Sequence, residues 1–387
     1  KNKKKKIKRY WYPVNQSLNI SLNNESLLID MLEEKLLKSI QYWVKSDVPL
    51  SSLLSGGVDS GLITALASKY DKKIITYTAF SPDQPDSDER YLAKQTIKQL
   101  FGSYENHSEV SLSSSGLVDS ISHLIDFLDI PSHAANTNTL MKICKNIKEN
   151  NFSKVVLCGE GSDEIFGGYY RYRSIADEYK DTNNPDILVY AYNRVAIPRL
   201  KLLKQEISIP NKSRWEIEKH CLSREPTSRS LELDQQTFLC PYLQRQDHIG
   251  MMYSLEMRTP FLDHNIVEFA NALPDKYKIR KDNNGHYWHK YILRKVAERY
   301  LDKEIVWNKK KYQFNAPVSQ SLQKGHLYNL LKLQMKNMIL GEYYNTSGIN
   351  KLLEDHKPGT KVDNHSDNSN ILWRIINLES WLRSNIK

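Results

Sequence analysis

The sequence predicts an α/β protein: a parallel sheet with helices on both faces, followed by a mainly helical second half. Short apolar runs alternate with segments of helical periodicity in the first half of the chain, a pattern typical of strands joined by right-handed helical crossovers. Two of these runs lead directly into loops that carry glycine and acidic residues. After about residue 170 strand-like runs become scarce, and helical periodicity dominates to the end.

The N-terminal elements are expected in the order helix, strand, glycine loop, helix. Apolar residues recur at helical spacing from 27 to 44, after two asparagines suited to capping a helix. Residues 48–54 are typical of a short strand that runs into the loop at 55–60, and residues 62–70 mark one face of the next helix. Strand, loop and helix together form the first half of a βαβ unit.

The later elements of the sheet region follow the same alternation. Asp86, with Glu89 three residues later, is typical of a capping box that starts a helix. Further strands are expected at 74–80, 110–112 and 154–158, and further helices at 116–128 and 138–150. The regions expected along the chain are a basic head and interdomain linker at 1–26, an α/β core at 27–206, a polar loop at 207–236, and a helical part at 237–387 that completes the domain.

Composition argues against several classes of protein. No apolar run is long enough to span a bilayer, and no signal-peptide pattern follows the basic start. The four cysteines form no C-x-x-C pair, which favours a reducing, cytoplasmic compartment over a disulfide scaffold. The formal net charge of +10 suggests a nucleic-acid-binding protein, but seven positive charges lie in the first nine residues, and such runs are usually solvated tails. We therefore expect neither a membrane nor a nucleic-acid partner.

The first loop has the chemistry of a phosphate cradle. Two adjacent glycines let the backbone turn tightly at the end of a strand, and the next helix N-terminus adds partial positive charge. Serine hydroxyls can donate to phosphate, but the carboxylate of Asp59 needs a bridging cation, which predicts Mg²⁺. A tight turn that merely connects strand and helix is the structural alternative. We expect nucleotide contacts from Leu54, Ser55, Gly56, Gly57, Asp59 and Ser60.

The second loop, residues 159–164, also follows a strand. Ligands of open α/β sheets bind beyond the carboxyl ends of the strands, where such loops converge. Asp163 is therefore expected as a second carboxylate for the same Mg²⁺, because this ion commonly takes one or two protein carboxylates together with phosphates and water. Gly159 joins the expected nucleotide contacts. An acidic helix start without a ligand is the structural alternative.

The two loops, followed by Gly167, Gly168 and Tyr169, resemble the synthetase domain of glutamine-dependent asparagine synthetases. Residues 254–263 resemble that family's S-x-E-x-R-x-P-F-L-D stretch, and residues 307–314 resemble the segment that holds its catalytic lysine. The similarity covers about residues 10–380, with the motifs in the family's order. It implies an ATP-pyrophosphatase (PP-loop) domain with an adenine nucleotide alpha hydrolase-like fold.

The resemblance implies that ATP adenylates a carboxylate, that pyrophosphate leaves, and that ammonia attacks and displaces AMP. Lys311 matches the catalytic lysine of K-x-x-F, and Glu160 matches the residue that takes a proton from the attacking nitrogen. Glu256 is expected to support that site, although an ion pair with Arg258 explains it equally well. Arg258 and Glu164 are expected to contact the substrate.

A glutaminase domain precedes the synthetase domain in the family's asparagine makers, and this sequence contains none. The lysine-rich head, followed by Arg9, Tyr10 and Trp11, resembles the linker that joins the two domains. We therefore expect a glutaminase domain or subunit as the partner, with ammonia from another source as the alternative. A homo-oligomer is compatible with the sequence.

The acceptor region departs from the family pattern. Residues 245–251 differ from the frequent K-x-D-R-x-S-M form, and residues 131–136, near the expected acceptor pocket, are not a firm match. Aspartate, converted to asparagine, is the leading acceptor. The alternative is an amidotransferase or amide-bond cyclase acting on a carboxylate of a glycan, a cell-wall precursor, a peptide or a β-amino acid.

Overall fold

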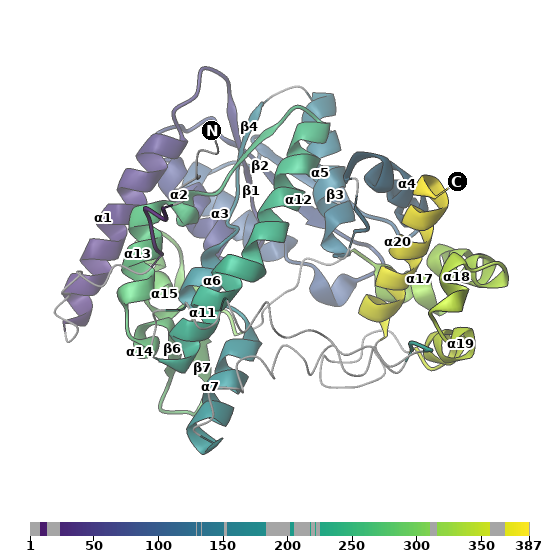
Figure 1. Ribbon diagram of the computed structural model, residues 1–387. Helices are drawn as coiled ribbons and strands as arrows, with labels where there is room; N and C mark the ends of the chain where they lie inside the picture. Colours follow the sequence, from purple (N-terminus) through teal and green to yellow (C-terminus); the bar gives the residue numbers. More distant parts are fainter. Residues whose placement is uncertain are drawn as a thin grey trace, which may run out of the picture.

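The computed structural model describes residues 8–13, 24–128, 130–132, 134–150, 153–182, 202–204, 217, 221, 225–309, 316–356 and 368–386. Its centre is a five-stranded sheet in which every neighbouring pair of strands is parallel (Figure 1). The spatial order is β3-β2-β1-β4-β5. The strands are β1 (Leu50–Leu53), β2 (Ile75–Phe80), β3 (His107–Ser111), β4 (Val155–Leu157) and β5 (Glu256–Arg258).

The strand order places the two glycine loops beside each other. β1 pairs with β2 on one side and with β4 on the other, so that Ser51 stands opposite both Ile75 and Val156. The chain runs outward from β1 to β3 and then returns to lay β4 on the opposite side of β1. Such a reversal opens a crevice at the carboxyl ends of the strands. The loops after β1 and β4 both lie at this point.

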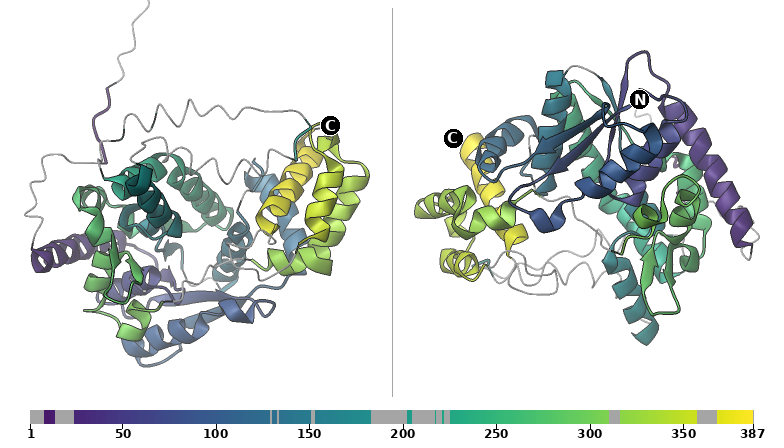
Figure 2. Two further views of the ribbon diagram at one scale, coloured as in Figure 1. Left: turned by 90° about the horizontal axis from the view of Figure 1, so that it is seen from below. Right: turned by 180° about the vertical axis from the view of Figure 1, so that it is seen from behind.

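Helices cover both faces of the sheet, as Figure 2 shows. In β4, Val155 and Leu157 pack into one apolar cluster and Val156 into another, because successive side chains of a strand alternate between faces. The first cluster includes α1 (Glu25–Trp43), α2 (Val58–Ala67), α13 (His264–Ala272) and α15 (Tyr291–Ala297). The second includes α4 (Gly116–Leu128), α5 (Asn136–Asn150) and α12 (Leu239–Met252).

The rest of the described chain is mostly helical, which confirms the predicted fold class. Four C-terminal helices share an apolar cluster with α4 (Figure 1): α17 (Val318–Lys324), α18 (His326–Lys336), α19 (Thr346–Glu354) and α20 (Ser369–Asn385). A hairpin of β6 (Ile279–Lys281) and β7 (Tyr287–His289) leads into α15. The other helices are α3 (Arg90–Phe101), α6 (Ser162–Phe166), α7 (Tyr170–Thr182), α11 (Pro226–Thr237), α14 (Asp275–Lys278) and α16 (Lys303–Val306), with 3₁₀ turns at Pro85–Ser87, Pro260–Leu262 and Ile339–Glu342.

Several local expectations agree with the structure and others differ: β3 spans His107–Ser111 and not 110–112, and α2 ends at Ala67 and not near residue 70. Asn24 caps α1, its side-chain oxygen accepting from the Leu27 N–H at 3.1 Å. Most of the polar loop expected at 207–236 lies outside the described residues, but its end is helical: α11 begins at Pro226, and proline is well suited to the first turn of a helix. The capping box also differs: α3 begins at Arg90, and Glu89 makes no cap bond to its own helix. Among the described helices, none combines the length and apolar character required to cross a bilayer.

Candidate active site

A cavity of about 1260 Å³ lies at the carboxyl ends of the central strands. Both glycine loops line it, together with residues of α5, α12, the β6–β7 hairpin, α15 and α20. The structure therefore brings together most of the nucleotide, metal and proton-transfer residues that the sequence suggests. These cavity-lining residues are Leu54, Ser55, Gly56, Gly57, Asp59, Ser60, Gly159, Glu160 and Asp163.

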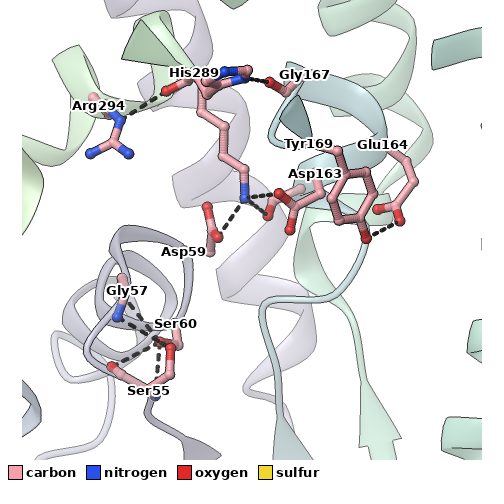
Figure 3. Close-up of polar contacts among 12 residues, drawn as sticks. Ser55, Gly57, Asp59, Ser60, Asp163, Glu164, Gly167, Tyr169, His289 and Arg294 are labelled. Atoms are coloured by element: carbon pink, nitrogen blue, oxygen red, sulfur yellow. Dashed lines mark hydrogen bonds and ion pairs between the residues drawn. The ribbon is translucent and has the colours of Figure 1, made fainter. Parts of the chain in front are cut away.

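Internal hydrogen bonds hold the first loop in a tight turn. The Ser60 Oγ accepts from the Ser55 N–H at 3.0 Å and lies 2.9 Å from the Ser55 Oγ, which in turn accepts from the Gly57 N–H at 3.2 Å (Figure 3). The Gly56 N–H donates to the Glu89 Oε2 at 2.8 Å. The turn is thus shaped before any ligand enters, which lowers the ordering cost of binding.

Position 56 has no room for a side chain, so glycine is needed there. A Cβ at this position would stand 2.8 Å from the Leu92 Cβ and 2.9 Å from the backbone oxygen of Glu89. The loop therefore packs directly on the start of α3. The sequence did not indicate Glu89 as a partner of this loop, because its spacing from Asp86 suggested a helix cap.

The carboxylates of the two loops converge on one cation, the ammonium group of Lys290. The Lys290 Nζ lies 2.6 Å from the Asp59 Oδ2 and 2.9 Å from the Asp163 Oδ1, and it also donates to the Ser162 Oγ at 3.0 Å. Figure 3 shows Asp59 and Asp163 facing the same point from opposite sides. Two carboxylates from neighbouring strands can therefore share a single cation.

Lys290 stands at a backbone position that a lysine rarely adopts. It is the N-cap residue of α15, with φ 57° and ψ 39°, in the left-handed region. The residues beside it fix this junction: the His289 ring nitrogen Nδ1 lies 2.8 Å from the Gly167 carbonyl oxygen, and the Arg294 Nε donates to the His289 carbonyl at 2.8 Å. Such local strain is often found at functional sites. None of the sequence motifs described above contains Lys290.

The donor set between the loops fits a divalent ion that prefers oxygen ligands. The Asp59 Oδ1 is buried and has no hydrogen-bond partner, so a ligand position on this carboxylate remains to be filled. Within the described residues, no group of three or more His, Cys, Asp and Glu side chains is arranged to hold a metal ion. A magnesium ion here would rely on these two carboxylates, with phosphate and water as its other ligands.

Glu160 lies beside this centre, facing the cavity with 36% of its side chain exposed. Burial is the main cause that raises the pKa of its carboxyl group, and the negative charge of Asp163 raises it further, whereas the charge of Arg245 lowers it. A raised pKa makes the carboxylate a better proton acceptor than an exposed glutamate.

Glu164 lies behind the cavity wall and is 1% exposed. Its Oε1 accepts from the Tyr169 hydroxyl at 2.7 Å. Burial, followed by the neighbouring charge of Asp163, raises the pKa of its carboxyl group. The structure does not bring Glu164 to the cavity, so its suggested contact with substrate has no geometric support.

Glu256 and Arg258 also lie away from the described cavity lining. The Arg258 Nε donates to the Glu256 Oε1 at 2.7 Å, and its Nη1 donates to the carbonyls of Trp43 and Lys45 at 2.5 and 2.9 Å. This arginine thus holds β5 to the end of α1. Lys311 lies outside the described residues.

A family model and several curated proteins match most of this chain. A family model described as "Asparagine synthase" matches residues 31–383. "Asparagine synthetase [glutamine-hydrolyzing] 1" of Bacillus subtilis strain 168 is 25% identical over 94% of this chain and 60% of its own length. "Asparagine synthetase [glutamine-hydrolyzing] 3" of the same organism is 29% identical over 68% of this chain and 45% of its own length.

The similarity extends to differently named proteins. "Amidase chry2" of Gibberella zeae is 23% identical over 76% of this chain and 53% of its own length. Among solved structures, the U34-tRNA thiolase NcsA of Methanococcus maripaludis aligns with 93% of this chain and 89% of its own, with 11% identity and a TM-score of 0.30. The chain spans about 60% of the length of the first curated relatives that it matches. Since the family model covers most of the sequence, the chain belongs to the asparagine synthase family.

Proposed function

We propose that this chain forms an amide by adenylating a carboxylate with ATP, which prepares it for attack by ammonia. The proposal rests on the convergence of Asp59 and Asp163 on one cation. The loop at 55–60, called the phosphate loop from here on, and Glu160 line the same cavity. Family membership supports the general reaction class. Aspartate remains the leading acceptor, and a carboxylate of a glycan, a cell-wall precursor, a peptide or a β-amino acid is the alternative.

In the first step, a carboxylate oxygen of the acceptor attacks the α-phosphorus of ATP. A bond forms between that oxygen and phosphorus, the bond to the β-phosphate breaks, and pyrophosphate leaves. The loop at Ser55–Ser60 provides the turn that would hold the phosphates, and the cations Lys290 and Arg294 lie close enough to Asp59 and Asp163 to offset charge there. Without such cations, the negative charges of both phosphates and carboxylates would repel one another.

In the second step, ammonia attacks the carbonyl carbon of the acyl adenylate. The adduct must lose a proton before it collapses to amide and AMP, and Glu160, which lines the cavity, would accept that proton. Its raised pKa suits this role. The balance is one carboxylate, one ATP and one ammonia converted to one amide, one AMP, one pyrophosphate and one proton.

Asp59 and Asp163 would hold Mg²⁺, which when bound would neutralise the phosphates. Without the ion, the ammonium group of Lys290 occupies the same two carboxylates, so the chain itself provides the positive charge there until Mg²⁺ displaces it. We include a glutaminase domain or subunit as the source of ammonia, because these relatives are named as glutamine-hydrolysing enzymes and the chain spans about 60% of their length. The four cysteines are free, in keeping with a cytoplasmic location as part of the proposal.

Pyrophosphate release tests this function directly. The protein is given ATP, Mg²⁺, ammonium and a panel of carboxylic acids, and the products are identified by mass spectrometry. We expect one class of acid to yield AMP, pyrophosphate and an amide in equal amounts. An acid-dependent release of ADP and phosphate would instead indicate an acyl phosphate and would contradict the proposal.

Lys311 provides a second test, since it matches the family's catalytic lysine. We expect Lys311→Ala to lower the rate of pyrophosphate release by at least about 100-fold, because a positioned charge on transferring phosphates typically supplies an effect of this size. Lys310→Ala is the matched control and should keep the parental rate. Equal losses in both variants would show that the effect is not specific to residue 311.

A further inference from the structure

The described segment at 8–13, the N-terminal segment, lies against α13 and contributes no residue to the cavity lining (dark purple in Figure 1). The Trp11 indole N–H donates to the Glu268 Oε1 at 2.8 Å. About one turn further along the helix, the Asn271 Nδ2 donates to the Pro13 carbonyl at 2.9 Å. These two contacts anchor the N-terminal segment to α13.

The Asn271 side chain connects this contact to α11 and α6. Its amide forms a reciprocal pair with that of Gln235: the Asn271 Nδ2 donates to the Gln235 Oε1 at 2.9 Å, and the Gln235 Nε2 donates to the Asn271 Oδ1 at 2.9 Å. The Gln235 Nε2 also donates to the backbone carbonyl of Glu164 at 3.0 Å. A continuous series of hydrogen bonds therefore joins the carbonyl of Pro13 to that of Glu164.

The two ends of this series fix the orientation of both amides. A backbone carbonyl can only accept a hydrogen bond, so each end requires an N–H donor from the amide that faces it. Each amide nitrogen has two hydrogens, and it donates one to a backbone carbonyl and one to the other amide. If either amide were turned over, its oxygen would face a carbonyl oxygen. Since Asn271 is only 6% exposed, water cannot easily replace a bond that is lost there.

The inner end of the series lies in the helix that carries the second carboxylate. Glu164 directly follows Asp163 in α6, a helix of five residues. Gly161 before this helix and Gly167 after it have φ values of 90° and 76°, in the left-handed region that glycine adopts readily. A helix this short, between two such turns, depends on contacts from neighbouring elements to hold its position. Gln235 supplies one of these contacts from α11.

We propose that the paired amides of Asn271 and Gln235 position the second loop, and that the N-terminal segment acts on the loop through them. Neither residue lines the cavity, so both act by holding α6 and not by touching substrate. For its effect on catalysis the proposal rests on the proposed function, because the second loop carries Glu160 and Asp163. Movement of the N-terminal segment away from α13 loosens the hold on this loop.

Hydrogen–deuterium exchange of the backbone amides in and after α6 tests the coupling without requiring catalysis. The Ile165 N–H donates to the Gly161 carbonyl at 3.2 Å, and the N–H groups of Gly167 and Gly168 donate to the Asp163 carbonyl at 3.1 and 2.9 Å. Their exchange therefore reports the opening of α6 and of the turn that follows it. Amides of α18, which packs in a different apolar cluster, report any general loss of stability.

Two variants break the series at different points. Gln235→Met keeps the length of the side chain but removes its amide, and Trp11→Ala removes an anchor of the exposed segment. We expect the α6 amides to exchange at least tenfold faster in Gln235→Met and at least threefold faster in Trp11→Ala. Gln236→Met and Tyr10→Ala are the matched controls and should exchange as the parent does. The Gln236 amide bonds to Cys221 and to its own helix, and Tyr10 is 96% exposed.

The double variant decides whether the segment acts through the amides. Adding Trp11→Ala to Gln235→Met should change the exchange of α6 little further, because the connection is already broken. Additive effects of the two substitutions would overturn the proposal. So would an equal change in the α18 amides, which would mean a general loss of stability. Because Trp11 is exposed, parental exchange in Trp11→Ala refutes the coupling even where Gln235→Met does not fold.

Turnover measures the consequence for catalysis. At a temperature where both proteins are fully folded, kcat for pyrophosphate release should fall at least tenfold in Gln235→Met, and a parental kcat would refute the positioning role. If the parent releases no pyrophosphate with any acid while exchange responds as stated, the proposed function fails and the coupling stands. If the parent is active but exchange stays parental in both single variants, the function stands and the coupling is refuted.

Discussion

At the scale of single residues, the site depends on charged side chains that pair with one another. Lys290 holds two carboxylates from the tips of neighbouring strands, and its left-handed backbone places the ammonium between them. Removing it would leave Asp59 and Asp163 to repel each other in a partly buried setting. Lys290 and a divalent ion are thus expected to compete for the same oxygens.

This competition predicts the behaviour of Lys290→Met. The variant should bind Mg²⁺ alone at least tenfold more tightly than the parent, which corresponds to about 1.4 kcal/mol, because the ion no longer displaces an ammonium group. Thermal unfolding across a Mg²⁺ titration measures this affinity. An unchanged Mg²⁺ dependence would mean that the ion does not use these carboxylates.

Glu89 offers a pH-dependent test at the same scale. Burial raises the pKa of its carboxyl group from 4.5 to about 7, with the Gly56 N–H partly opposing this shift. A raised folded-state pKa means that the folded protein binds more protons than the unfolded chain between these values, so stability falls as pH rises through this window. Glu89→Gln keeps an acceptor oxygen for Gly56 but cannot ionise.

Between pH 4.5 and 7, we expect the parent to lose free energy of unfolding on the order of 3 kcal/mol, and we expect Glu89→Gln not to show this loss. Urea unfolding at several pH values measures both. The parent should weaken over this interval relative to the variant. Glu105→Gln, at an exposed position, serves as the control and should follow the parent. Identical pH profiles for the parent and Glu89→Gln would show that burial does not perturb this carboxyl group.

At the scale of elements, the sequence was informative wherever a strand ran into a glycine loop. The strands at 50–53 and 155–157 fall inside the predicted runs, because buried parallel strands read as continuous apolar stretches. The strand at 256–258 was not predicted as one, since its three residues include charged side chains on both sides of a methionine. Its place at the sheet edge depends on pairing with β4, which local sequence does not encode.

The turn after α6 gives a prediction at this scale. A Cβ on Gly168 would stand 1.7 Å from the Asp163 Oδ1 and 2.2 Å from the Lys290 Cε. Gly168→Ala should therefore displace both charged groups and reduce pyrophosphate release by about 100-fold, the effect expected of a misplacement near 1 Å. Gly116→Ala is the matched control, because the nearest atom to its Cβ would be 3.9 Å away. Full activity of Gly168→Ala would contradict the observed packing.

At the scale of the whole molecule, segments distant in sequence meet around one cavity. The phosphate loop follows β1, the second carboxylate follows β4, Lys290 comes from the start of α15, and Arg374 comes from α20. The sequence predicted that the phosphate loop and the second carboxylate would meet, because loops at the ends of adjacent parallel strands must converge. It could not predict Lys290 or the pairing of Arg245 with Asn136, which arise only from tertiary packing.

The central claim is that Asp59 and Asp163 hold one magnesium–nucleotide complex between the two loops. Calorimetric binding of α,β-methylene ATP, with Mg²⁺ and with EDTA, tests it in the parent, in Asp163→Asn and in the exposed control Asp126→Asn. We predict that Asp163→Asn weakens binding at least tenfold in Mg²⁺ but not in EDTA, whereas Asp126→Asn binds as the parent does. Parental affinity of Asp163→Asn in the presence of Mg²⁺ would contradict the claim.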